Sequence, residues 1–241
     1  ARGVVGGQLA PARATVTVAP GAPNAATTQA TGMGLAAAVA GIEAAFAVLP
    51  SDIYSNRRFI EGGTWTPALN LEVGSFDGGE ACEVVAFNQP DDSAAVVWND
   101  DLGRYDVTYA VASSGVLSFR MLLNGEDISG SPFKVRIEPG PTAAASSVLA
   151  GSGLAGAVVG ATGAASVTSY DAFDNRRTVG GDPFRLVVTP IVDQPNEPEF
   201  ALSDNGDGTY DAAYVLPTEA RYLLQVYLRG EHVGTSPFNS P

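Results

Sequence analysis

Short runs of alternating apolar and polar residues, separated by turn residues, fill the C-terminal part of the chain. The clearest runs lie at residues 165–170, 184–189, 199–202, 210–214 and 222–227. Alternation with a period of two is typical of β-strands, because successive side chains point to opposite faces of a sheet. The run at 222–227 is apolar on both faces in places, which indicates a central strand. About seven short strands in roughly 100 residues predict a β-sandwich.

The chain also contains an internal repeat. Residues 125–133, with the sequence GEDISGSPF, recur at 230–238 as GEHVGTSPF, 105 residues later. Upstream, residues 51–58 recur at 170–177, 119 residues later. The first copy is therefore longer inside, and its extra residues fall between Gly63 and Tyr105. We predict that they form a loop or an added strand in the acidic stretch at 78–92.

An Ala-rich stretch at residues 35–49 has the composition of a helix. Its counterpart in the second copy, residues 154–167, is instead rich in Gly, Val and Ser. Since equivalent positions of a repeat should fold alike, we predict strands in both copies. The expected fold class is all-β.

Pro-Gly pairs divide the chain. Pro139-Gly140-Pro141 follows the end of one copy, and Pro20-Gly21 stands at the equivalent place near the N-terminus. Residues 6–21 align without gaps on residues 125–140, although more weakly than the two full copies match each other. We predict three parts: residues 1–23 as the last strand of a preceding repeat, 24–140 as a repeat with an insertion, and 141–241 as a second repeat.

Charge and cysteine content narrow the function classes. A net charge of −13 and a pI near 4.3 argue against nucleic acid and anionic lipid surfaces, which bind by neutralising phosphate with basic side chains. The single cysteine, Cys82, cannot form an intrachain disulfide and favours a reducing compartment. The apolar stretch 35–49 contains Glu43 and is shorter than the roughly 20 residues of a membrane span. We expect no direct membrane insertion, and residues 1–20 lack the pattern of a signal peptide.

Three motifs could suggest chemistry, and each has a simpler structural interpretation. The glycines at 151, 153 and 156 match a dinucleotide fingerprint in letters, but β-type sequence follows them instead of a helix. Residues 204–208 superficially resemble a calcium loop, yet the ligand spacing is wrong and a hairpin turn with positive φ at Gly208 explains them. His232 is the only histidine and is expected in a polar turn. We predict no catalytic residue, no cofactor and no metal site.

A pair of arginines recurs at one place in both copies. Arg57 and Arg58 correspond to Arg176 and Arg177, just before a Gly-Gly pair. Positive spots on an acidic molecule suggest electrostatic docking of an acidic partner. The simpler alternative is a solvated turn or pairing with neighbouring carboxylates.

The motifs of the second copy form one string, which comprises Gly151-Ser152-Gly153-Leu154, Asp171-Ala172-Phe173-Asp174-Asn175, Gly180-Gly181-Asp182-Pro183-Phe184, and the segments 204–210 and 234–238. This string resembles the filamin-type (filamin/ABP280) repeat, and the resemblance extends to residues 25–140 with a divergent centre, where Thr64-Trp65 replaces the Asp-x-Phe of the family. It implies tandem immunoglobulin-like β-sandwiches. It also implies that partners add a β-strand beside strand C and pack side chains between strands C and D. On this chain those strands carry Phe184, Arg185, Leu186, Val187 and Val188, and Glu199, Phe200, Ala201 and Leu202.

These observations favour a non-enzymatic scaffold in the cytoplasm, cytoskeleton or axoneme. Its expected partners are other proteins, either cytoskeletal or axonemal components or partner peptides. The alternative is an extracellular adhesion or gamete-surface ectodomain built from the same module, since fold does not settle function. A third possibility, an accessory domain of a secreted enzyme, requires a catalytic domain that these residues do not contain.

Overall fold

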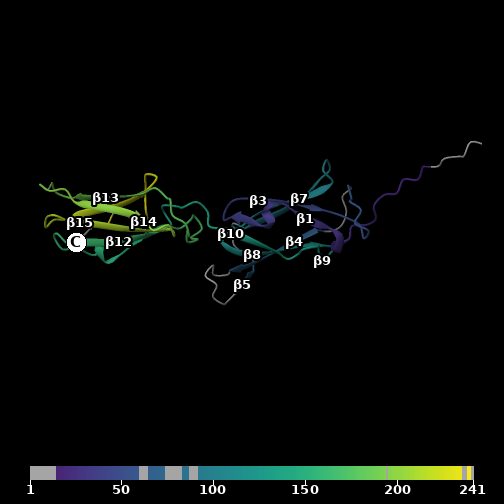
Figure 1. The fold of residues 1–241 in the computed structure, drawn as a ribbon, viewed down its shortest axis with the longest axis horizontal. Coiled ribbons are helices and arrows are strands. Elements are labelled where there is room, and N and C mark those ends of the chain that lie inside the picture. Colours follow the sequence, from purple (N-terminus) through teal and green to yellow (C-terminus); the bar gives the residue numbers. More distant parts are fainter. Residues whose placement is uncertain are drawn as a thin grey trace, which may run out of the picture.

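The computed structural model describes residues 15–59, 65–73, 83–86, 92–193, 195–234 and 238–239. Within these ranges the chain forms strands and three short 3-10 turns, η1 (Ala25–Thr27), η2 (Met33–Leu35) and η3 (Ser152–Leu154). The strands build two β-sandwiches that lie one after the other along the molecule (Figure 1). Over this part of the chain, we find no helix with the length and hydropathy needed to span a bilayer.

The first sandwich consists of two sheets. One has the order β1-β3-β7-β6, and the other has the order β2-β10-β8-β4-β5 with β9 paired to β8. All pairs are antiparallel except β2 with β10. The strand bounds are β1 (Gln29–Thr31), β2 (Ala37–Val39), β3 (Ala44–Leu49), β4 (Trp65–Val73), β5 (Glu83–Ala86), β6 (Ser93–Asn99), β7 (Arg104–Ala110), β8 (Gly115–Leu123), β9 (Glu126–Asp127) and β10 (Phe133–Glu138).

The second sandwich repeats this plan with fewer strands. One sheet has the order β11-β12-β15-β14, and the other pairs β13 with β16, which also pairs with β17 and β18. The strand bounds are β11 (Val148–Ala150), β12 (Thr162–Thr168), β13 (Phe184–Pro190), β14 (Glu199–Asp204), β15 (Thr209–Val215), β16 (Tyr222–Leu228), β17 (Glu231–His232) and β18 (Phe238–Asn239). The predicted all-β fold of tandem immunoglobulin-like sandwiches is confirmed.

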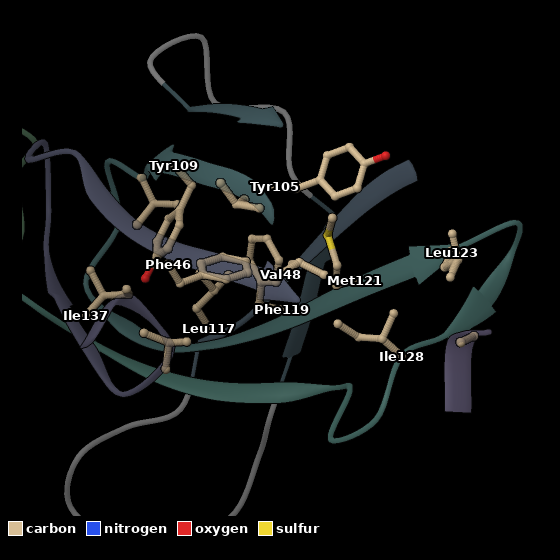
Figure 2. Packing of buried hydrophobic residues seen from close by; sticks show 14 of the residues in the cluster. Phe46, Val48, Tyr105, Tyr109, Leu117, Phe119, Met121, Leu123, Ile128 and Ile137 are labelled. Carbon is tan, nitrogen blue, oxygen red and sulfur yellow. The ribbon is translucent and has the colours of Figure 1, made fainter. Parts of the chain in front are cut away.

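Each sandwich closes its own hydrophobic core. In the first, Phe46, Tyr109 and Phe119 meet between the sheets, with the Phe119 ring 5.1 Å from that of Phe46 (Figure 2). In the second, the buried residues of β16 alternate along the strand from Tyr222 to Leu228 and pack on the facing sheet. This alternation, with partners on both sides of β16, confirms the predicted central strand.

The Ala-rich stretch at 35–49 is β-structure. After η2 it forms β2 and β3, and β3 pairs with β1 and β7. The buried residues Phe46 and Val48 come from alternate positions of β3. Tertiary pairing therefore overrides the helix propensity of the alanines, and neither copy forms a helix at these positions beyond the short 3-10 turns. The predicted strand at 154–167 is correct only for 162–167, in β12, because residues 155–161 form no strand and the second copy lacks a counterpart of β2.

The extra residues of the first copy include an added strand. β5 lies within the predicted stretch at 78–92 and pairs with the C-terminal half of β4, from Asn70 with Ala86 to Val73 with Glu83. The second copy has no counterpart of β5 in the residues described there. The rest of the predicted insertion lies outside the described residues.

The predicted strand of a preceding repeat falls mostly outside the described residues. Residues 15–20 are described, and they form no strand. The equivalent residues of the first copy form β10 because β8 and β2 pair with them. The proposed division at residues 23 and 140 stays a prediction.

Candidate interaction surfaces

The edge of β13 is open. β13 pairs with β16 along its full seven residues. In the ranges that the structure describes, no strand pairs with its other side. An unpaired edge presents backbone N–H and C=O groups that can pair with another extended chain. All nine predicted groove residues lie on β13 and β14, the edge strands of the two facing sheets.

Two apolar side chains of β14 lie on the core-facing side of this edge strand, opposite the buried Tyr214 and Ala212 of β15. Leu202 packs against the core, and Phe200 lies on the same face of the strand, two residues earlier. Phe200 is nevertheless 46% exposed, because the facing sheet ends at β13. A strand added beside β13 would cover this ring, which gives strand addition a hydrophobic contribution.

The outer face of β13 offers a second set of contacts. Leu186 and Val188 point into the core, so Arg185 and Val187 point outward. They line a cleft of about 470 Å³ together with Pro183, Tyr227, Arg229 and Gly230. Alternate side chains of an added strand would therefore meet Phe200 on one face and Val187 on the other.

The first sandwich differs at the equivalent edge. There β4 takes the place of β13 and pairs with β8 on one side and with β5 on the other. The inserted strand thus occupies the edge that is open in the second sandwich. β5 covers only residues 70–73 of β4, whereas the corresponding side of β13 is open along the whole strand in the residues described.

A second arrangement, which the sequence did not reveal, holds the linker between the sandwiches. The carboxylate of Asp171, 0% exposed, accepts a hydrogen bond from the backbone N–H of Gly140 at 2.6 Å. It also accepts bonds from the backbone N–H groups of Phe173 and Asn175 and from the Asn175 side chain. Arg177 completes the set by donating to the carbonyl of Gly140 at 2.8 Å. We call Asp171, Arg177 and Gly140 the linker clamp.

The first repeat contains the same clamp. Asp52 accepts hydrogen bonds from the backbone N–H of Gly21 at 2.8 Å and from the Asn56 side chain at 3.0 Å. Arg58, 8% exposed, donates to the carbonyl of Gly21. The signal in the sequence was the common offset of 119 residues that relates both the Asp-x-x-x-Asn-Arg-Arg motifs and the Pro-Gly pairs.

The clamp gives a prediction about pH. The hydrogen bond from the Asn56 side chain, followed by that from the Gly21 N–H, lowers the pKa of Asp52 from 3.8 to about 2. Because the folded pKa is the lower one, this group stabilises the first repeat above pH 4, and its contribution is lost as the pH falls through about 2. We expect the unfolding free energy of wild type, measured with denaturant, to fall more steeply than that of Asp52→Asn across this window. Parallel pH profiles of the two proteins would contradict the role of Asp52.

In addition to the linker, a direct contact joins the facing ends of the two sandwiches. The side-chain amide of Asn175 donates to the Ala112 carbonyl at 2.7 Å and accepts from the Ser114 N–H at 2.8 Å. Phe173, from the same loop, packs on Gly41, where a β-carbon would lie 2.1 Å from the ring. Gly41 has φ +73°, which further favours glycine. We call Phe173 and Asn175 the plug, and the Gly41, Ala112 and Ser114 surface the socket.

The two arginines of each pair contact different groups. Arg58 and Arg177 point at linker carbonyls, so their guanidinium groups have an internal role that the docking hypothesis did not include. Arg57 donates to the carbonyl of Gly103 at 3.1 Å. Arg176, 49% exposed and 4.0 Å from Asp207, is the one of the four whose position best suits docking. Electrostatic docking stays a prediction.

The glycine and acidic motifs have structural roles. Gly151 and Gly153 let η3 approach β12 closely, since a β-carbon on Gly151 would lie 2.6 Å from the Ala165 Cα. In the β14–β15 hairpin, Asp204 accepts a hydrogen bond from the backbone N–H of Gly206, and it accepts another from the N–H of Gly181, before β13. Gly208 has φ +81°, as predicted for the turn. His232 lies in β17, with its ring 4.5 Å from that of Tyr227, and not in the turn that we expected. The two-residue strand forms because β16 pairs with it.

Known proteins share this architecture. The chain is similar to the Escherichia coli adhesin FdeC, with 18% identity, a TM-score of 0.60, and coverage of 93% of this chain and 67% of that one. It is also similar to invasin, a bacterial integrin-binding protein, with 12% identity, a TM-score of 0.54, and coverage of 91% and 40% of the two chains. At these identities the two likenesses concern the fold alone.

Sequence comparison is more specific. Filamin-C of Rattus norvegicus is 28% identical over 182 residues, and Filamin-C of Mus musculus is 29% identical over 182 residues. These matches cover 71% of this chain and 6% of each relative, so the chain corresponds to a small part of their length. The model of the Filamin/ABP280 repeat matches residues 22–134 and 141–239. Repeats of this family are structural and protein-interaction modules, and the chain belongs to the filamin repeat family.

Proposed function

We propose that this chain is a non-enzymatic scaffold segment of the cytoskeleton or axoneme, and that its second repeat binds partner peptides by β-strand addition at β13. The observation that supports it most is the open edge of β13 beside the half-exposed ring of Phe200. Main-chain hydrogen bonds to an edge provide affinity, and alternate pockets provide selection. The first repeat, whose equivalent edge is partly covered by β5, acts as a spacer.

The groove favours a partner of defined chemistry. An apolar side chain of the peptide would cover Phe200, and the next side chain would lie beside Val187 on the outer face. Arg185, exposed in the same cleft, suits a carboxylate on the peptide. The proposed partner is thus an extended, β-branched or aromatic peptide with one acidic residue.

Binding of selected peptides tests this proposal. Peptides are selected on the wild-type chain from a random displayed library, and their affinities are measured by calorimetry. We expect Val187→Glu and Phe200→Ser each to weaken binding at least tenfold, about 1.4 kcal/mol, because each removes one face of the groove. The matched control is Val148→Glu on β11, which places the same charge at a 49% exposed valine of another edge strand. Equal affinity of Val187→Glu and wild type would place the site elsewhere.

An extracellular adhesion role is the alternative, and it predicts a different location for the native protein. Immunolabelling of permeabilised cells should place a scaffold along filaments or axonemes. Labelling of intact, unpermeabilised cells would instead support the adhesion role. The single cysteine, which cannot form an intrachain disulfide, supports the intracellular setting.

A further inference from the structure

The contact between the two repeats pairs the socket of the first repeat with the plug of the second. The first repeat also has a plug and the second repeat also has a socket, and both of these surfaces are exposed. In the first repeat, Tyr54 and Asn56 stand where Phe173 and Asn175 form the plug of the second. Tyr54 is 83% exposed and the neighbouring Ile53 is 66% exposed, whereas Phe173 at the joint is 38% exposed. The linker clamp that orients this loop is already formed around Gly21. Of the residues described, the segment 18–24 borders this loop, and Val18 and Ala19 line a cleft of about 490 Å³ together with Ile53 and Tyr54. The ring of Tyr54 stays largely uncovered in that cleft, so the first repeat carries an exposed plug.

The second repeat presents the matching socket. Gly160 has φ +72° and donates its backbone N–H to the carbonyl of Leu216, as Gly41 with φ +73° does to Val111. At the covered socket a β-carbon on Gly41 would strike Phe173, whereas a β-carbon on Gly160 would have no described atom within 4 Å. The residue before Gly160, Val159, is 51% exposed, so it borders the uncovered socket and can carry a substitution there.

The backbone groups that bind the plug asparagine also have counterparts in the second repeat. Across the joint, the Asn175 side chain contacts only backbone groups of the first repeat, the carbonyl of Ala112 and the N–H of Ser114. In the second repeat, Pro217 and Glu219 occupy the corresponding positions. A carbonyl and an N–H are available there whatever the side chains, and proline lacks only an N–H, which this contact does not use. A plug asparagine can therefore find the same two partners.

We propose that the surface around Tyr54 is a docking site for another filamin-type repeat. That repeat would contact Tyr54 through a socket equivalent to the one around Gly160. The two repeats would then meet head to tail, as the socket of the first repeat meets the plug of the second in this chain. Such a contact uses two different surfaces of the repeat, so it does not close on itself and extends into a row of repeats. Within one polypeptide the linker raises the effective concentration of the neighbouring repeat, which lets a small interface suffice.

The whole chain supplies both halves of this contact, so a second copy of it serves as the probe. Sedimentation equilibrium is run up to about 1 mM, the weak end of specific association, because no linker joins the copies. Tyr54→Asp removes the plug and Val159→Asp removes the socket, each at an exposed position that leaves the cores intact. We expect the weight-average mass of wild type to rise with concentration beyond that of a dimer, while each variant alone remains at the monomer mass of 24.7 kDa.

The most informative experiment mixes the two variants, because Tyr54→Asp keeps an intact socket and Val159→Asp keeps an intact plug. The mixture should form a one-to-one complex and grow no further. Val187→Glu, which acts on the β13 edge, should assemble like wild type, and loss of assembly in that variant would mean that the chains associate through strand pairing instead. A wild type that stays monomeric, a Tyr54→Asp chain that still assembles, or a mixture that forms no complex would each overturn the proposal.

Discussion

Phe119→Ala is expected to destabilise the first repeat by about 3–5 kcal/mol and to leave the second repeat nearly unchanged. Phe119 is fully buried, and its ring lies 5.1 Å from that of Phe46 and 5.5 Å from that of Tyr109. Truncation removes these contacts and leaves a cavity between the sheets of the first sandwich. The second sandwich has a separate core, so its free energy of unfolding should change by no more than about 0.5 kcal/mol.

The tryptophans make this measurement selective. Trp65 and Trp98 both lie in the first repeat, so their fluorescence in a denaturant titration follows that repeat, while circular dichroism follows both. Leu224→Ala, in the core of the second repeat, is the matched control. It should shift the dichroism transition and not the fluorescence transition. A single transition that moves in both probes with either substitution would mean that the two repeats share one cooperative core.

Asp171→Ala should destabilise the second repeat by about 3 kcal/mol and loosen its joint with the first. The carboxylate accepts four hydrogen bonds and is 0% exposed, so its removal leaves buried N–H groups without an acceptor. One of these groups is the linker N–H of Gly140, and another is the Asn175 side chain that contacts the first repeat.

Two readouts separate the effects of Asp171→Ala. Dichroism in denaturant gives the loss of stability, and small-angle scattering under native conditions gives the spread of distances between the repeats. We expect a broader distribution of distances for Asp171→Ala than for wild type. The control is Asp174→Asn, an exposed neighbour for which asparagine tolerates the same positive φ of 63°. An Asp171→Ala protein as stable and as compact as wild type would show that the clamp contributes little.

Local patterns were enough to predict five strands of the second repeat, β12 to β16. The alternation at 222–227 corresponds to the buried residues of β16, and the repeat register favoured strand over helix at 35–49, where residues 37–39 and 44–49 are strands despite the propensity of their alanines. Residues 207–208 encode their turn by themselves, because Gly208 must adopt a positive φ. Each of these signals lies within a few residues or in a comparison of two copies.

The interaction surfaces depend on contacts that local patterns do not encode. The Gly140 N–H meets Asp171 31 residues away, and the Asn175 amide meets Ala112 63 residues away. Which sheet edge is open also depends on pairing across the sandwich. β5 covers β4 in the first repeat, and its sequence alone did not distinguish an added strand from a loop. The arginine pairs of the repeated loop were therefore interpreted as docking spots or as a solvated turn, although Arg177 bonds to the Gly140 carbonyl beside the buried Asp171.

The most direct test of the proposed function is hydrogen exchange of the backbone amides, resolved by residue, with and without a saturating selected peptide. If the peptide adds a strand at β13, alternate amides from Arg185 to Thr189 whose N–H groups face the open edge should exchange more slowly, and amides of β4 and β11 should not change. Slower exchange confined to another surface, with β13 unaffected, would contradict strand addition at this edge.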